Sequence, residues 1–191
     1  MNAVEPIRDR KKINAIKGNL KRSDPRNFLL FTLGINTALR ISDILGLKVE
    51  DVKETSGEIK EYLDINEQKS GKQRHIYINA EVKSALEFFF NKTRLYDLDR
   101  YLFTAHQKNK NVPISRVRAW QMIRDWCNQV GVRGRLGTHT LRKSAGYHMR
   151  MAGVPIEMIA EVLGHRSTTI TKRYIGITND EVTKVLKNFN L

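Results

Sequence analysis

The stretch Gly137-Thr138-His139-Thr140-Leu141-Arg142-Lys143-Ser144 places a histidine and an arginine three residues apart, at the start of a helix predicted over residues 139–151. Side chains at this spacing share one face of a helix. The free N–H groups and the positive dipole end of a helix N-terminus add their own attraction for an anion. Alone, a His-x-x-Arg pair is usually a solvated helix face, so its meaning depends on the rest of the chain.

Four further residues fall in order around this pair: Arg40 and Lys69 before it, and His165 and Tyr174 after it. Arginines give planar, bidentate donors that stay charged at any relevant pH, which suits Arg40 and Arg142 to hold one phosphate from two sides. A phenol that follows such cations can attack the phosphorus. The ordered set therefore indicates a site that binds a phosphodiester and attacks it with Tyr174.

Composition favours the same kind of partner. The chain has 191 residues with 34 Lys+Arg against 20 Asp+Glu, giving a formal net charge of +14 and a pI near 10.0. An excess of this size indicates a polyanion, either nucleic acid or an anionic membrane. No apolar run approaches the ~20 residues needed to span a bilayer, and the N-terminus lacks the apolar region of a signal peptide. We therefore expect nucleic acid and no membrane.

The single cysteine, Cys127, excludes an internal disulfide and fits a reducing cytosol. Its helical context predicts a buried small hydrophobe. No Cys/His cluster has the spacing of a zinc site, and we expect neither a metal nor a cofactor.

The hydrophobic pattern predicts a mostly α chain with one small antiparallel β-sheet, an α+β class. Pro6 is expected in the first turn of a helix, Asp24-Pro25 opens a second helix, and Ser42 or Asp43 caps a short third one. A hairpin is expected with Lys69 at or just before its tip. The predicted strands are 59–65 and 74–78, and the later helices are 80–94, 115–131, 139–151, a helix from Pro155, 167–174 and about 180–189.

These residues together resemble a known family. The segment Thr37-Ala38-Leu39-Arg40-Ile41-Ser42-Asp43-Ile44-Leu45-Gly46-Leu47 resembles the first arginine motif of the tyrosine recombinases, the phage integrase family. The stretch 137–144 is similar to the family's His-x-x-Arg motif. Leu163-Gly164-His165-Arg166-Ser167, with Tyr174 nine residues after His165, resembles its C-terminal motif, and Lys69 matches its lysine. The resemblance spans about residues 6–190.

The resemblance implies a role for each residue. Tyr174 would be the nucleophile that forms a 3′-phosphotyrosyl bond, and Arg40 and Arg142 would bind the scissile phosphate. Lys69 would protonate the leaving 5′-oxygen. In addition, His139 would assist proton transfer at the tyrosine, His165 would donate a hydrogen bond to the phosphate, and Asp43 would support the site without reacting.

The resemblance also implies an organisation. We expect one catalytic domain over residues 1–191, with a core of about 6–177, no N-terminal core-binding domain, and a C-terminal helix of about 180–191 exchanged between protomers. The apolar stripe of that helix is as consistent with docking on its own domain. The expected partners are double-stranded DNA, further copies in a tetramer on DNA (a monomer or weak dimer when free), and accessory DNA-bending or directionality proteins. The expected location is the cytoplasm, in association with the nucleoid.

Three functions remain open from the sequence. The first is a site-specific recombinase or integrase, favoured by the length and the Leu-Gly-His-Arg-Ser context. The second is a nicking-closing enzyme that resembles type IB topoisomerases, which share the phosphotyrosine chemistry. The third is a DNA-binding module without catalysis, against which the presence of all six residues argues. Recombination between two sites, compared with relaxation at one site, distinguishes the first two functions. Covalent trapping of DNA tests the third.

Overall fold

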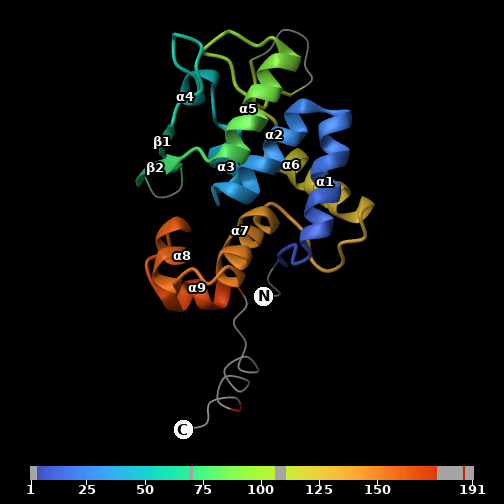
Figure 1. Cartoon of the computed structure of the whole chain (residues 1–191), viewed down its shortest axis with the longest axis vertical. Coiled ribbons are helices and arrows are strands. Elements are labelled where there is room, and N and C mark those ends of the chain that lie inside the picture. The colour runs from blue at the N-terminus through green and yellow to red at the C-terminus, as the bar shows by residue number, and fades with distance from the viewer. Residues whose placement is uncertain (1–3, 69–70, 106–110, 176–186, 188–191) are drawn as a thin grey trace.

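The structure, a computed structural model, describes residues 4–68, 71–105, 111–175 and Lys187 (Figure 1). It confirms the expected class, since most described residues are helical and the sheet among them has two antiparallel strands. The elements are α1 (Arg10–Ser23), α2 (Pro25–Asn36), α3 (Ile41–Leu45), α4 (Val49–Val52), β1 (Tyr62–Asn66), β2 (Gln73–Tyr77), α5 (Ala80–Thr93), α6 (Arg116–Gln129), α7 (His139–Met151), α8 (Ile156–Val162) and α9 (Thr168–Ile175).

Helix α2 is the centre of the fold. It begins as predicted, with Pro25 in its first turn and the Asp24 side chain accepting hydrogen bonds from the N–H groups of the next turn. Its residues 28–34 are all buried between α1, α5 and α7. A helix that is apolar all round can be stable only when it is surrounded by other elements. The loop that carries Arg40 therefore leaves a rigid, buried support.

Helix α7 joins two hydrophobic cores. Leu141, near its start, belongs to the large core around α2. One turn later, Ala145 belongs to a smaller core formed with α8 and α9. Figure 1 shows these three C-terminal helices beneath the larger body of the molecule. A Cβ atom at Gly146 would lie 2.9 Å from Cγ2 of Ile175, so the small residue lets α9, which carries Tyr174, approach α7 closely.

The hairpin is confirmed, with shifted ends. Tyr62 lies opposite Tyr77, and Asn66 opposite Gln73. The expected start at residue 59 was wrong, because Ile59 instead pairs in an isolated bridge with Lys53, outside the ladder. The turn follows β1 directly, and Lys69 lies in it, outside the residues that the structure describes.

Two expected helix starts were wrong. Helix α1 begins at Arg10, capped by Asp9, because residues 4–9 instead run along α7, where the Ile7 N–H donates to Ser144 at 2.8 Å. At α3 the N-cap position is held by Arg40, without a side-chain cap, so neither Ser42 nor Asp43 caps this helix. The expected helix at about 180–191 lies outside the described residues, Lys187 excepted.

No helix within the described part of the chain is long and apolar enough to cross a bilayer. As expected, Cys127 is fully buried, and burial raises the pKa of its thiol to about 12.

Replacing Gly34 by alanine tests the close approach of α2 to α7. The added Cβ would lie 2.5 Å from Cδ1 of Leu141, which is itself buried. Overpacking costs about 1–3 kcal/mol, more than the ~1 kcal/mol that alanine gains over glycine in helix propensity. We expect the urea midpoint of Gly34→Ala to fall. Gly18→Ala in α1 is the matched control: its Cβ would meet only a flexible Arg22 nitrogen, at 3.6 Å, so its midpoint should rise. A midpoint of Gly34→Ala at or above the wild-type value would contradict this packing.

Candidate active site

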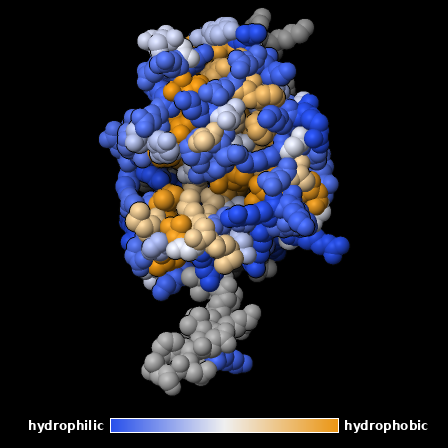
Figure 2. Space-filling view, viewed as in Figure 1, coloured by the Kyte–Doolittle hydropathy of each residue, from blue (hydrophilic) through white to orange (hydrophobic). Residues whose placement is uncertain are grey.

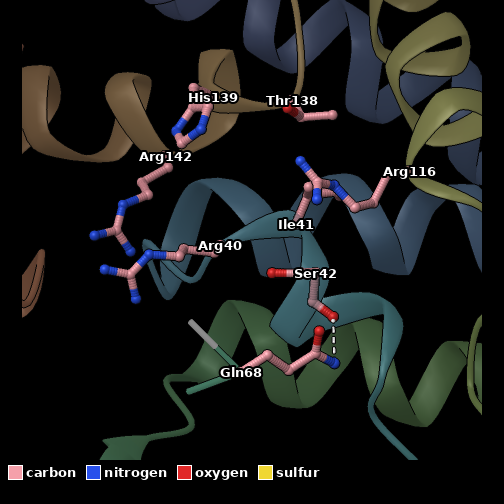
Figure 3. A pocket seen from close by; sticks show the side chains of 8 residues that line it. All are labelled: Arg40, Ile41, Ser42, Gln68, Arg116, Thr138, His139 and Arg142. Atoms are coloured by element: carbon pink, nitrogen blue, oxygen red, sulfur yellow. Dashed lines mark hydrogen bonds between the residues drawn. The ribbon is translucent and has the colours of Figure 1, made fainter. Parts of the chain in front are cut away.

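Arg40 and Arg142 come together at one cavity, although they are about a hundred residues apart in sequence. Figure 3 shows their guanidinium groups side by side at its edge, Arg40 from the start of α3 and Arg142 from the first turn of α7. The cavity holds about 340 Å³ and is lined by Arg40, Ile41, Ser42, Gln68, Arg116, Thr138, His139 and Arg142. Two planar cations at one opening form a site for a phosphate group.

Arg142 is fixed by two backbone carbonyls. It is buried, and it donates to the Ala38 oxygen at 2.5 Å and to the Leu163 oxygen. Ala38 has a φ of +53°, which costs a non-glycine residue of the order of 1–2 kcal/mol. Burial is the main cause that lowers the pKa of Arg142 from its ordinary value. The two acceptors lie two residues before Arg40 and two residues before His165, so one side chain holds both segments.

Tyr174 reaches the same site from α9. Its hydroxyl lies 3.3 Å from Nδ1 of His139, so the structure brings together the two residues that the sequence separates by 35 positions. Burial raises the pKa of Tyr174 to about 12, although the positive charge of Arg142 acts in the opposite direction. The phenol is therefore protonated at neutral pH and needs a base to become a nucleophile. His139 lies close to the distance that such a transfer requires.

His165 follows α8 at the edge of this site. Its Nδ1 lies 2.9 Å from the hydroxyl of Thr171. Burial, followed by the charges of Arg142 and Arg40, lowers its pKa from 6.5 to about 4, so the ring is neutral at pH 7. The Thr171 hydroxyl also lies 3.4 Å from the Ser167 carbonyl oxygen; when it donates to Nδ1 in place of that oxygen, the proton of the neutral ring resides on Nε2. His165 is then a hydrogen-bond donor without being a cation.

Asp43 lies in α3, directly after the segment that carries Arg40, and does not cap the helix. It is buried, and its Oδ1 accepts the backbone N–H of Gln68 at 3.1 Å. Its other oxygen has no hydrogen-bond partner among the described residues. The contact ties α3 to the residue immediately before Lys69. The placement of Lys69 itself is outside the described residues.

Several residues near the site were not predicted from the sequence. Lys143 is buried, with its ammonium 5.0 Å from the centre of the Tyr174 ring, and burial lowers its pKa. Arg116, at the start of α6, contributes to the cavity wall opposite Arg40 (Figure 3). Glu67 forms an ion pair with Arg40. Lys143 directly follows Arg142 within the quoted stretch 137–144, a position that could have signalled it, whereas no spacing rule connects Arg116 and Glu67 to the motifs.

The positive charge at this site comes from arginine side chains. Within the described ranges, no group of three or more His, Cys, Asp or Glu side chains is arranged to hold a metal ion. What the arrangement can do is hold an anionic diester at Arg40 and Arg142, donate to it from His165, and present a tyrosine beside a base.

Comparison with known proteins matches one family along most of the chain. The profile of the phage integrase family matches residues 8–181. The chain is 38% identical over 189 residues to the probable integrase/recombinase YoeC of Bacillus subtilis (strain 168), which covers 99% of this chain and 98% of that protein. It is 30% identical over 181 residues to the tyrosine recombinase XerA of Pyrococcus horikoshii, covering 95% of this chain but only 59% of XerA.

Solved structures show the same fold. The XerH recombinase bound to a palindromic difH substrate matches with a TM-score of 0.76 at 21% identity, over 96% of this chain and 51% of that one. The XerA recombinase matches with a TM-score of 0.74 at 22% identity, over 98% of this chain and 66% of that one. The chain thus spans about half to two thirds of these structures.

Acidification tests the neutral state of His165. In the unfolded chain a histidine titrates near 6.5, whereas folded His165 titrates at about 4. Between these values the unfolded chain binds a proton that the folded protein does not, so the free energy of unfolding falls as pH falls through this window. We expect wild type to lose more stability between pH 7 and pH 5 than His165→Gln, measured by urea unfolding.

His75→Gln is the matched control, because His75 is exposed on the hairpin and contacts Asp64. This variant should lose at least as much stability as wild type over the same pH range. A loss in His165→Gln as large as in wild type would mean that His165 is not the group held neutral.

Proposed function

Because the chain belongs to the phage integrase family, we propose that it is a site-specific DNA recombinase that cleaves and rejoins strands through a 3′-phosphotyrosyl intermediate. The observation that carries the proposal is the convergence of Tyr174 and His139 beside Arg40 and Arg142. The net charge of +14 supports a DNA partner, since phosphate contacts dominate the affinity of proteins for DNA.

The scissile phosphate is held by the two arginines. Arg40 and Arg142 contact its non-bridging oxygens, where negative charge grows as the phosphorus is attacked. At other enzyme sites that stabilise an anion, removing one preorganised donor of this kind lowers the rate by roughly 10²–10³-fold. The carbonyl contacts of Arg142 fix its orientation before DNA arrives. Neutral His165 adds a hydrogen bond through Nε2.

The strand is broken by transfer and not by hydrolysis. The oxygen of Tyr174 attacks the phosphorus, and its proton passes to His139. The bond from phosphorus to the 5′-oxygen breaks, and that oxygen takes a proton from Lys69 to leave as a 5′-hydroxyl. Attack by a 5′-hydroxyl on the phosphotyrosine reverses every step and rejoins DNA. The energy of the broken bond is kept in the covalent intermediate, so no nucleotide cofactor is needed.

The proposal extends to assembly. Recombination requires two duplexes, and we propose a tetramer on DNA, coupled by exchange of the helix expected at about 180–191. Exposed hydrophobic side chains on α8 and α9, Met158 and Ile170, offer an apolar surface to such a helix. Figure 2 shows hydrophobic surface on the lower part of the molecule, where these helices lie. Docking on its own domain is the alternative. Accessory DNA-bending proteins and a location at the nucleoid in the cytoplasm complete the proposal.

Substituting Tyr174 by phenylalanine tests the nucleophile. The probe is a pool of DNA duplexes that have a randomised central sequence and a nick. After cleavage the short end beside the nick dissociates, so the strand cannot be rejoined and the covalent complex accumulates. We expect wild type to form an adduct that survives denaturing electrophoresis and Tyr174→Phe to form none, because the phenol oxygen is the only atom removed.

DNA binding by Tyr174→Phe should remain within about twofold of wild type, since the phosphate contacts persist. Tyr147→Phe, on α7, is the matched control and should trap DNA normally. An adduct with Tyr174→Phe would show that another residue attacks. Two further assays separate the remaining functions. Recombination between two sites recovered from the pool indicates a recombinase, whereas relaxation of a plasmid that carries one site, without recombination, indicates a nicking-closing enzyme.

Lys69→Ala tests the proposed general acid. A 5′-bridging sulfur leaves as a thiolate, which needs no proton, so a missing acid should not slow its departure. We expect the variant to cleave an oxygen-bridged duplex far more slowly than wild type but a sulfur-bridged duplex at a similar rate. Lys72→Ala, in the same turn, is the control. Equal slowing on both substrates would show that Lys69 only positions the DNA.

A further inference from the structure

We propose that Glu67 is a positioning residue of this site: its buried carboxylate fixes the guanidinium of Arg40 and ties it, through Arg74, to the segment that presents His165. The inference rests on the proposed function, because it assigns to Arg40 the task of holding a phosphate.

The carboxylate of Glu67 lies between two arginines. Its Oε2 is 2.5 Å from Nη1 of Arg40, and its Oε1 is 3.0 Å from Nη1 of Arg74. The Glu67 side chain is only 1% exposed, whereas that of Arg40 is 20% exposed and lines the cavity. Nη1 of Arg40 is thus held from inside by the charge of Glu67, in an ion pair without hydrogen-bond geometry, while the side chain remains open to a ligand.

Arg74 continues this chain of contacts to the end of α8. Its Nη2 donates to the Val162 oxygen at 2.7 Å. Gly164, two residues later, lies against the same pair: a Cβ atom there would be 2.8 Å from Nη1 of Arg74 and 3.4 Å from Oε1 of Glu67. His165 directly follows Gly164. The Glu67–Arg74 pair therefore borders the backbone that positions His165.

The backbone of Glu67 also closes the turn in which Lys69 lies. Its N–H donates to the Lys72 oxygen at 3.0 Å, and its own oxygen accepts from the Gly71 N–H at 2.8 Å. A single residue thus connects the phosphate-binding arginine, the lysine turn and, through Arg74, the C-terminal helices. These are the parts that must act on one phosphodiester together.

Stability alone is a weak reason for such a group. The cost of removing charges from water commonly offsets their attraction, and buried ion pairs can often be replaced by apolar residues without loss. A functional reason is stronger. Arginine has a long side chain with many rotamers, and a guanidinium already held in one orientation loses less freedom when it binds a phosphate in the transition state.

Two effects of Glu67 oppose each other, which makes the inference testable. Its negative charge weakens the electrostatic attraction between the site and DNA, while its contact with Arg40 favours the transition state. Replacing it by neutral glutamine should therefore leave DNA binding equal or tighter but slow the chemical step. Loss of structure alone would weaken both.

The experiment compares Glu67→Gln with Glu81→Gln, which removes the same charge at an exposed carboxylate paired with Lys17 on α1. The probe is a nicked duplex recovered from the randomised pool by wild type. At saturating protein we expect Glu67→Gln to form the covalent adduct at least ~10-fold more slowly than wild type. This loss is smaller than the ~10²–10³-fold loss of rate expected when a phosphate-binding donor is removed altogether. Its dissociation constant for DNA should not rise. Glu81→Gln should behave as wild type in both measurements.

A double-mutant cycle with Arg40 distinguishes positioning from a general structural role. We expect Arg40→Ala to form the adduct slowly, and Glu67→Gln to slow that variant by less than about a further twofold, because the residue through which Glu67 acts is gone. The same fold-loss in both backgrounds would overturn the inference, as would an adduct rate for Glu67→Gln within twofold of wild type.

If Glu67→Gln fails to fold, Glu67→Asp replaces it. This variant keeps the charge but withdraws the carboxylate from Arg40 by one methylene, so it should slow the adduct without weakening DNA binding; an unchanged rate would overturn the inference. Failure of the proposed function looks different, since wild type itself would then form no adduct with any duplex of the pool.

Discussion

The contact of Arg142 with two backbone carbonyls is the constraint on which the site depends. A buried guanidinium must have its N–H groups satisfied, and here two of them donate to the oxygens of Ala38 and Leu163. Those carbonyls belong to the segments that lead to Arg40 and to His165. Lysine has no planar fork and cannot hold two carbonyls in this way while it faces an anion. Arg142 is therefore a structural tie as well as the proposed ligand for the phosphate.

Ala38 and Leu163, whose carbonyls Arg142 contacts, both belong to the smaller hydrophobic core, and Ala38 lies two residues before Arg40. Arg40 belongs to the body built around α2, whereas His165 and Tyr174 belong to the smaller group of α7, α8 and α9. The site therefore depends on how these two parts are placed, and Gly34 allows the close approach of α2 to Leu141 of α7 that joins them. The paired charges of Glu67 and Arg74 add a second connection on the hairpin side. The arginines proposed to bind the substrate thus also connect the parts that carry the other site residues.

The sequence predicted the residues better than the contacts between them. Arg40, His139, Arg142, His165 and Tyr174 were recognisable because their local motifs keep fixed spacing, and α2 was recognisable from Asp24-Pro25 and its apolar run. The third helix was capped differently from the prediction, because Asp43 uses its carboxylate on the hairpin. Glu67 gave no signal, since an acidic residue after a strand usually faces solvent and only tertiary structure places it between Arg40 and Arg74.

Mapping the covalent bond tests the central claim most directly. A trapped complex would be digested with nuclease and trypsin, and the modified peptide sequenced by tandem mass spectrometry. Cleavage after Arg173 and Lys184 leaves a peptide that begins at the proposed nucleophile. The account predicts a nucleotide joined through its 3′-phosphate to Tyr174. A nucleotide on any other residue, or one joined through a 5′-phosphate, would contradict it.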